Sequence, residues 1–276
     1  MKLHIVPART GVDWVRQGIR VFWRQPLALT LLFFTTTAAM SLLSVLPLIG
    51  PAIALALLPA ATLVMMEAAA ETSLGRIPTP ALIVHAFRTG RQRLGALAVL
   101  GGIYALLFLL IIGLASLADA GQFARVYFGV EPLTQEVATS SGFVVATWIV
   151  MGLYVPLSML FWHAPGLVHW HNVPPVKALF FSAVACARNI GAFTLFSIVW
   201  FGVFIGAGIV VSLVVTLLAV AGLGNAIVAA MMIASALVLA SMFFTSIVFT
   251  FRDNFEPPER PNTQNAQNAR NTEFID

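Results

Sequence analysis

The stretch LGALAVLGGIYALLFLLIIGLASL, from Leu94 to Leu117, decides the class of this protein because it contains no ionisable acidic or basic side chain. A helix needs about 20 apolar residues to cross roughly 30 Å of hydrocarbon, so the stretch predicts a transmembrane helix. The composition of the chain agrees: 59% of its 276 residues are apolar and 9% are charged. Soluble domains carry roughly 25% charged residues, so lipid must surround much of this chain.

Five further stretches have the same apolar character and a similar length. The six predicted spans lie near Leu27–Leu48, Ala52–Ala70, Leu94–Leu117, Gly142–Trp162, Ile190–Leu218 and Ala226–Phe251. The predicted fold class is therefore all-α, a polytopic membrane domain that covers residues 1–251. Residues 252–276 are rich in Pro, Asn and Gln and have no apolar face to bury, which predicts a disordered cytoplasmic tail.

The distribution of Lys and Arg predicts the orientation of these spans. Of the 15 basic residues, fourteen lie before the first span, between spans two and three, between spans four and five, or in the tail. Arg125 alone lies on the other side. Cytoplasmic segments carry an excess of Lys and Arg. We therefore predict a bacterial inner-membrane protein with both its N-terminus and its C-terminus in the cytoplasm.

The cytoplasmic segments resemble one another. Residues 7–24, 78–93 and 174–189 each begin with proline, continue as an amphipathic or apolar helix, and end on a polar residue where the chain enters the bilayer. Each segment is followed by one span up and one span back. We interpret this pattern as three cytoplasmic-side amphipathic helices within a threefold internal repeat. The third helix, the most apolar of the three, is expected to be buried against the other helices.

The first of these helices separates apolar residues from arginines. Its apolar face comprises Val12, Val15, Ile19 and Phe22, with Trp14 and Trp23 at the flanks. Its basic face comprises Arg16, Arg20 and Arg24. This pattern is typical of a helix in the membrane interface, with arginines near anionic lipid headgroups. The alternative is a helix packed on the cytoplasmic ends of the bundle with solvated arginines, and the two interpretations are compatible.

A set of ionisable side chains is expected at the cytoplasmic ends of spans two and four. It comprises Glu67, Glu71, His163, His169 and His171. Imidazole and carboxylate groups could together hold a divalent transition metal or act as a switch that titrates near neutral pH. The favoured interpretation is structural, with the imidazoles hydrogen-bonded to loop backbone. We accordingly predict neither a metal nor a cofactor.

Three small residues carry further expectations. Gly202 and Gly206 form a G-x3-G pattern in the fifth span, which favours close contact between helices. Cys186 is the single cysteine, and it is interpreted as a small buried apolar residue rather than a reactive thiol.

Several stretches of the chain resemble a family of uncharacterised bacterial inner-membrane proteins. They are VPARTG (Val6–Gly11), FWRQPLAL (Phe22–Leu29), LPLIGPAIALALLPA (Leu46–Ala60), AFRTGRQRL (Ala86–Leu94), FWHAPGLVHWH (Phe161–His171), PPVKALFFS (Pro174–Ser182) and RNIGAF (Arg188–Phe193). A fainter likeness links the chain to the membrane domain of glycerophosphodiester phosphodiesterases. Because this sequence lacks the soluble catalytic domain of those enzymes, the likeness implies no activity.

These observations leave three hypotheses of function. The favoured one is a non-enzymatic accessory, scaffold or lipid-interacting module, whose partners are membrane lipids and a further protein or a second copy of the chain, with no nucleic acid. The alternative is a small permease or exporter of a small molecule or metal ion, although no carboxylate lies at mid-membrane to couple transport. The third is a membrane-embedded enzyme acting on lipids, for which no acid/base pair or nucleophile arrangement is found. A filled or a hollow bundle interior would discriminate between the first two.

Overall fold

A computed structural model describes residues 2–83, 91–222 and 224–255 of the chain. These residues form helices joined by short connections. The helices are α1 (Thr10–Phe22), α2 (Pro26–Ser44), α3 (Gly50–Ser73), α5 (Arg91–Asp119), α6 (Gln122–Tyr127), α7 (Gln135–Thr139), α8 (Ser141–Phe161), α9 (Ala164–His171), α10 (Pro175–Arg188), α11 (Ile190–Val220) and α12 (Asn225–Asn254). The fold is all-α, as predicted.

Within the described residues, six helical segments are long and apolar enough to cross a membrane, and they coincide with the six predicted spans. The last helix, α12, continues to Asn254, so the first residues assigned to the tail are helical. Asn254 is fully buried, and the next residue, Phe255, forms an antiparallel bridge with Leu3. Contacts with the N-terminal segment thus extend the helix beyond its apolar stretch. The predicted tail from residue 256 lies outside the described residues.

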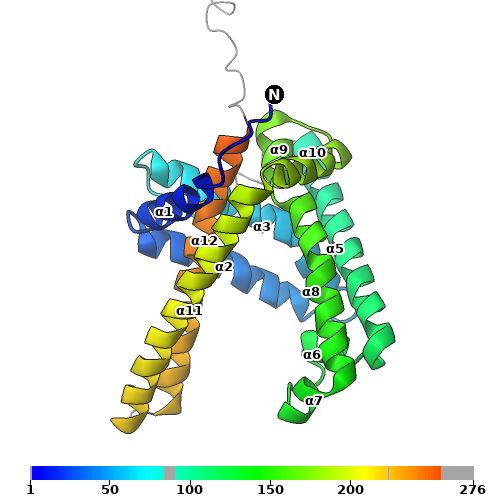
Figure 1. Ribbon diagram of the computed structural model, residues 1–276, viewed down its shortest axis with the longest axis vertical. Helices are drawn as coiled ribbons and strands as arrows, with labels where there is room; N and C mark the ends of the chain where they lie inside the picture. The colour runs from blue at the N-terminus through cyan, green and yellow to red at the C-terminus, as the bar shows by residue number, and fades with distance from the viewer. Residues whose placement is uncertain (1, 84–90, 223, 256–276) are drawn as a thin grey trace, which may run out of the picture.

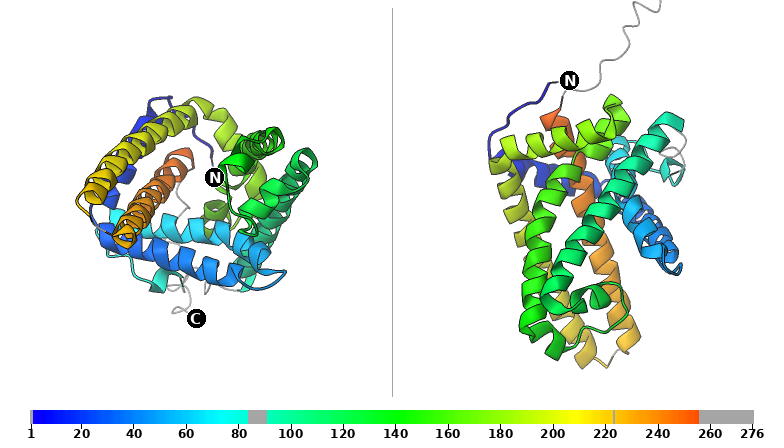
Figure 2. Two further views of the ribbon diagram at one scale, coloured as in Figure 1. Left: turned by 90° about the horizontal axis from the view of Figure 1, so that it is seen from below. Right: turned by 90° about the vertical axis from the view of Figure 1, so that its right-hand side faces the viewer.

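The spans are arranged as two arms and an oblique hairpin. The α11–α12 pair forms one arm and the α5–α8 pair forms the other, and the arms diverge away from the end that carries α1, α9 and α10 (Figure 1). The α2–α3 hairpin runs obliquely between them, and α3 contacts both α12 and α5. Seen from below, the hairpin lies along one side of the assembly (Figure 2). This arrangement keeps the two arms apart over much of their length.

Glycines allow three helix crossings to be very close. A Cβ added to Gly11 would lie 2.0 Å from the backbone oxygen of Ala192, and one added to Gly101 would lie 2.0 Å from that of Ala56. A Cβ on Gly18 would lie 2.4 Å from the Ser246 side chain. Since such distances are far below van der Waals contact, only glycine permits these crossings. They bring α1 onto α11 and α12, and α3 onto α5.

Helix α1 packs its apolar face against α11 and α12. The side chains of Trp14, Val15 and Phe22 are almost completely buried. Trp14 was expected at the flank of that face and is instead at its centre, where its indole N–H donates to Asp253 Oδ2 at 2.9 Å. The prediction failed because helical periodicity reports which residues share a face, whereas the crossing helices decide which of them is central.

Helix α10 agrees with its prediction on one face only. It was expected to be buried against the other helices, and Ala178 and Ser182 are buried there, whereas Val176 is 69% exposed and Phe180 is 63% exposed. The apolar residues of α10 therefore face both the bundle and the surroundings. The middle of the three predicted cytoplasmic helices includes residues 84–90, which lie outside the described residues. The threefold repeat stays a prediction.

Candidate functional site

Three arginines lie on the outer face of α1. Two of them are within the helix, and the third follows its C-terminal end. Arg16, Arg20 and Arg24 are all exposed. Arg16 has a weak contact with Asp13 at 3.9 Å, and the Arg24 guanidinium donates to the Ser73 carbonyl at 3.2 Å. Trp23 between them is 63% exposed. Because the apolar face already packs on the bundle, these cations and Trp23 are what α1 offers to its surroundings.

Glu67 and His169 form a buried pair between α3 and α9. Glu67 Oε1 lies 2.6 Å from His169 Nε2, and the two side chains are 10% and 6% exposed. The second carboxylate oxygen, Oε2, and the second ring nitrogen, Nδ1, are buried and have no hydrogen-bond partner among the described residues. Two of the five predicted polar residues are therefore brought together, although 102 positions separate them in sequence.

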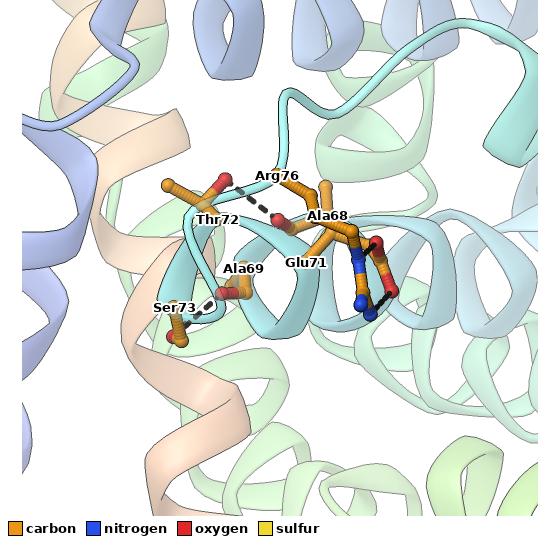
Figure 3. Close-up of polar contacts among 6 residues, drawn as sticks. All are labelled: Ala68, Ala69, Glu71, Thr72, Ser73 and Arg76. Atoms are coloured by element: carbon orange, nitrogen blue, oxygen red, sulfur yellow. Dashed lines mark hydrogen bonds and ion pairs between the residues drawn. The ribbon is translucent and has the colours of Figure 1, made fainter.

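Glu71 lies one turn further along α3 and has a different partner. Its carboxylate forms an exposed ion pair with Arg76, in which Nη2 donates to Oε1 at 2.7 Å (Figure 3). This contact raises the pKa of the Arg76 guanidinium. At the same helix end, the Thr72 and Ser73 hydroxyls donate to the carbonyls of Ala68 and Ala69 (Figure 3). These contacts close the C-terminus of α3 and point to a structural role.

His163 belongs to a polar junction that the sequence did not indicate. Asn254 Nδ2 lies 3.2 Å from His163 Nε2, which fits an amide donor and an unprotonated ring nitrogen. Asn189 Nδ2 in turn donates to Asn254 Oδ1 at 2.7 Å, and Asn189 Oδ1 accepts from the Val6 backbone N–H at 2.8 Å. The junction thereby joins the N-terminal segment, the α8–α9 corner, the start of α11 and the end of α12.

The three histidines do not converge on one point. His163 meets Asn254, His169 meets Glu67, and the His171 ring packs against the Phe251 ring with centroids 5.8 Å apart. No group of three or more metal-ligating side chains occurs within the described residues. The expectation that loop backbone accepts the imidazoles is wrong for His163 and His169, whose partners are side chains from distant helices.

The predicted close contact at Gly202 and Gly206 does not occur within the described part of the chain. A Cβ at either position would meet no atom of another element within 4 Å, and no residue of the apolar window of α11 is buried. Cys186 is 2% exposed, and burial raises the pKa of its thiol to about 12. Those are properties of a small buried residue.

A hollow that no sequence pattern indicated lies between the hairpin and the arms. One cavity of about 480 Å³ follows α2 and α3, and a second of about 450 Å³ lies among α3, α5, α8 and α12. Leu58, Thr62 and Phe244 line both, so the cavities adjoin. Tyr104 and Tyr154 face the second cavity. The bundle interior is therefore hollow on one side.

Six long apolar helices with buried apolar crossings define a polytopic α-helical membrane protein. Over 271 residues the chain is 38% identical to "Probable inner membrane protein BTH_II0599" of Burkholderia thailandensis, and the match covers 95% of this chain and 99% of that protein. The chain belongs to the family of this inner membrane protein. The resemblance to uncharacterised bacterial inner-membrane proteins is thereby confirmed, and so is the placement in the inner membrane.

No protein-family model and no solved structure matches the chain. The name of the relative gives a location and no activity. The likeness to the membrane domain of glycerophosphodiester phosphodiesterases stays a prediction.

Proposed function

We propose that this protein is a non-enzymatic, lipid-interacting module of the inner membrane. The observation that carries the proposal is the outer face of α1, where Arg16, Arg20 and Arg24 are exposed beside the 63% exposed Trp23. Tryptophan prefers the headgroup level of a bilayer, and arginines pair well with phosphate. The helix itself is held firmly because Trp14 and Phe22 are buried in the bundle.

The cytoplasmic orientation of both ends of the chain is part of the same proposal. Both ends of the described chain lie together, since the His4 backbone N–H donates to the Asn254 carbonyl at 2.9 Å. These two described ends lie at the end of the bundle that carries α1, α9 and α10 (Figure 1). The fourteen Lys and Arg residues that the sequence assigns to the segments on one side of the spans support a cytoplasmic location for that side. In this orientation α1 faces the inner leaflet, whose anionic lipids attract basic side chains by about 1 kcal/mol per charge.

Binding of anionic lipid tests the proposal. The protein is reconstituted in phosphatidylcholine bilayers that contain traces of spin-labelled phosphatidylglycerol or spin-labelled phosphatidylcholine, and the motionally restricted fraction of each is measured. The test variant carries Arg16→Gln, Arg20→Gln and Arg24→Gln. The matched control removes three basic residues elsewhere on the same side, through Arg91→Gln, Arg93→Gln and Arg188→Gln. We expect the preference for phosphatidylglycerol to fall more in the test variant. Equal preference in both variants and the unchanged protein would refute the proposal.

The hollow between the arms favours a second candidate function, a permease. Hydroxyl and aromatic side chains line it without any charged group among the described residues. A metal ion would need charged or imidazole ligands, so the substrate of such a permease would be an uncharged, largely apolar molecule. A water-filled path through the hollow is required by this alternative and not by the lipid-interacting module.

A further inference from the structure

The two adjoining cavities form one elongated slot along α3. Its lining on α3 runs from Pro51 at one end to Met65 towards the other. Fourteen helical steps of 1.5 Å give a length of about 21 Å. Half of a bilayer's hydrocarbon core measures roughly 15 Å. The slot is therefore long enough for the extended tail of a lipid in one leaflet.

Several hydroxyl groups in the slot are already engaged. The Thr36 hydroxyl donates to the Leu32 carbonyl at 2.8 Å, and the Thr62 hydroxyl donates to the Leu58 carbonyl at 3.0 Å. The Ser158 hydroxyl likewise donates to a carbonyl of its own helix at 2.7 Å. These threonines and serine thus offer no free O–H donor to a guest. What faces the slot is mainly methyl, methylene and aromatic surface.

This chemistry selects the occupant. A water molecule needs two to four polar partners, and cavities lined by apolar groups stay dry. An empty slot of this size would instead leave its walls without dispersion contacts. Volumes near 480 and 450 Å³ fall in the range of ligand-binding pockets. An apolar, flexible, elongated guest satisfies these conditions.

The slot is also open to the membrane. Met40 and Ala61 in its wall are only half-buried, and Ser41 is exposed. All three belong to helices that are apolar enough to span the bilayer, so the surroundings of the opening are lipid chains. The α2–α3 hairpin that carries these residues runs obliquely between the arms (Figures 1 and 2).

We infer that this slot is a binding site for one acyl chain of a bilayer phospholipid. The site rests on the proposed role as a lipid-interacting module and adds an internal tail site to the headgroup contact at α1. The tail site does not use the arginines of α1. The two ideas can therefore fail separately.

Photochemical crosslinking tests the site directly. The full chain is reconstituted with phosphatidylcholine that carries a diazirine on one acyl chain, irradiated, and mapped by peptide mass spectrometry. We expect crosslinks on peptides that contain Thr62 and Phe244, and these should persist when excess unlabelled lipid is added shortly before irradiation. Crosslinks on the lipid-exposed Ile205 and Ile209 of α11 report exchanging bulk lipid and should be diluted by the excess.

Filling the slot supplies the matched comparison. Ala54→Phe and Ala61→Phe each place a ring in the first cavity, whereas Ala98→Phe adds the same volume on an exposed face of α5. We expect crosslinking at Thr62 to fall about tenfold in either filled variant, which corresponds to about 1.4 kcal/mol. Crosslinking at Ile205 should be unchanged, and the control should behave as the unchanged protein. Two fillers are used so that one misfolded variant does not decide the result.

Two outcomes would overturn the inference. The first is crosslinking at Thr62 that is diluted as fully as that at Ile205, since the slot would then hold bulk lipid alone. The second is labelling of Thr62→Cys, in a Cys186→Ser background, by a membrane-impermeant thiol reagent, because a water-filled path would favour the permease. Loss of phosphatidylglycerol preference in the α1 variant with intact Thr62 crosslinks would support both ideas. Unchanged preference with intact crosslinks would refute the headgroup proposal alone.

Discussion

Replacing His169 by leucine removes the imidazole that lies 2.6 Å from Glu67 Oε1 and leaves the carboxylate inside the bundle. The side chain of Glu67 is 10% exposed, and its other oxygen already lacks a partner. Leucine keeps much of the side-chain volume, so the effect comes from lost pairing rather than from a large cavity. The change therefore isolates the energetic role of the buried pair.

The expected loss of stability arises from the Glu67 side chain, which stays in the bundle without the imidazole. An unsatisfied neutral polar group costs about 1–3 kcal/mol, whereas removing one partner of a buried ion pair costs about 3–5 kcal/mol. The second range applies to the charged form of the pair, in which the remaining carboxylate has no other partner in the described residues. At about 2–4 °C per kcal/mol for chains approaching this size, His169→Leu should lower the melting temperature by about 6–20 °C.

A double substitution sharpens this prediction. Replacing both Glu67 and His169 by leucine removes both polar groups, and such apolar replacements are often neutral or stabilising. The double variant should therefore melt at a higher temperature than His169→Leu alone. Arg76→Leu is the control, since it breaks the exposed pair with Glu71 one turn away, and exposed pairs contribute little.

Thermal unfolding of the detergent-solubilised protein, followed by near-ultraviolet circular dichroism, measures these differences. The reasoning is wrong if His169→Leu melts at the same temperature as Arg76→Leu. It is also wrong if the double variant is as unstable as the single one, because the cost would then arise from packing and not from the stranded carboxylate.

Three further predictions concern packing, reactivity and topology. Gly11→Ala places a methyl group 2.0 Å from a backbone oxygen of α11 and should cost about 1–3 kcal/mol in thermal unfolding, whereas Gly202→Ala should cost nothing; equal melting would contradict this. Cys186, with its pKa raised to about 12 by burial, should react with maleimide at pH 8 only after denaturation in SDS. In a Cys186→Ser background, an impermeant thiol reagent applied outside should label Thr134→Cys and not Thr79→Cys; the reverse pattern would invert the proposed orientation.

Much of the fold could be predicted from the sequence because a membrane span is a local property. Twenty consecutive apolar residues are enough to cross the hydrocarbon, whatever lies beside them, and six such stretches became six helices. Arg16 and Arg20 are exposed, whereas the interfacial role of their helix face stays a prediction. The burial of Cys186 agreed with the usual behaviour of a lone cysteine.

The partners of the polar side chains were decided only by the tertiary structure. Glu67 and His169 meet because α3 passes beside α9, and His163 meets Asn254 because α12 ends at the α8–α9 corner. No local pattern encodes such distant pairs. Gly202 has a recognised spacing, yet a Cβ added there would meet no atom within 4 Å from another element of the described chain.

The hollow between the hairpin and the arms was also decided only by the tertiary structure. Sequence gives the length and polarity of each span, but a cavity is the space that remains when spans cross at particular angles. The close approach of Gly101 to Ala56 holds α3 against α5, while α3 also reaches α12 on the other arm. The lining residues are ordinary apolar and hydroxyl side chains, so only their shared position marks a site. The sequence alone determined that this chain lies in lipid; the crossing of its helices decided where it is hollow.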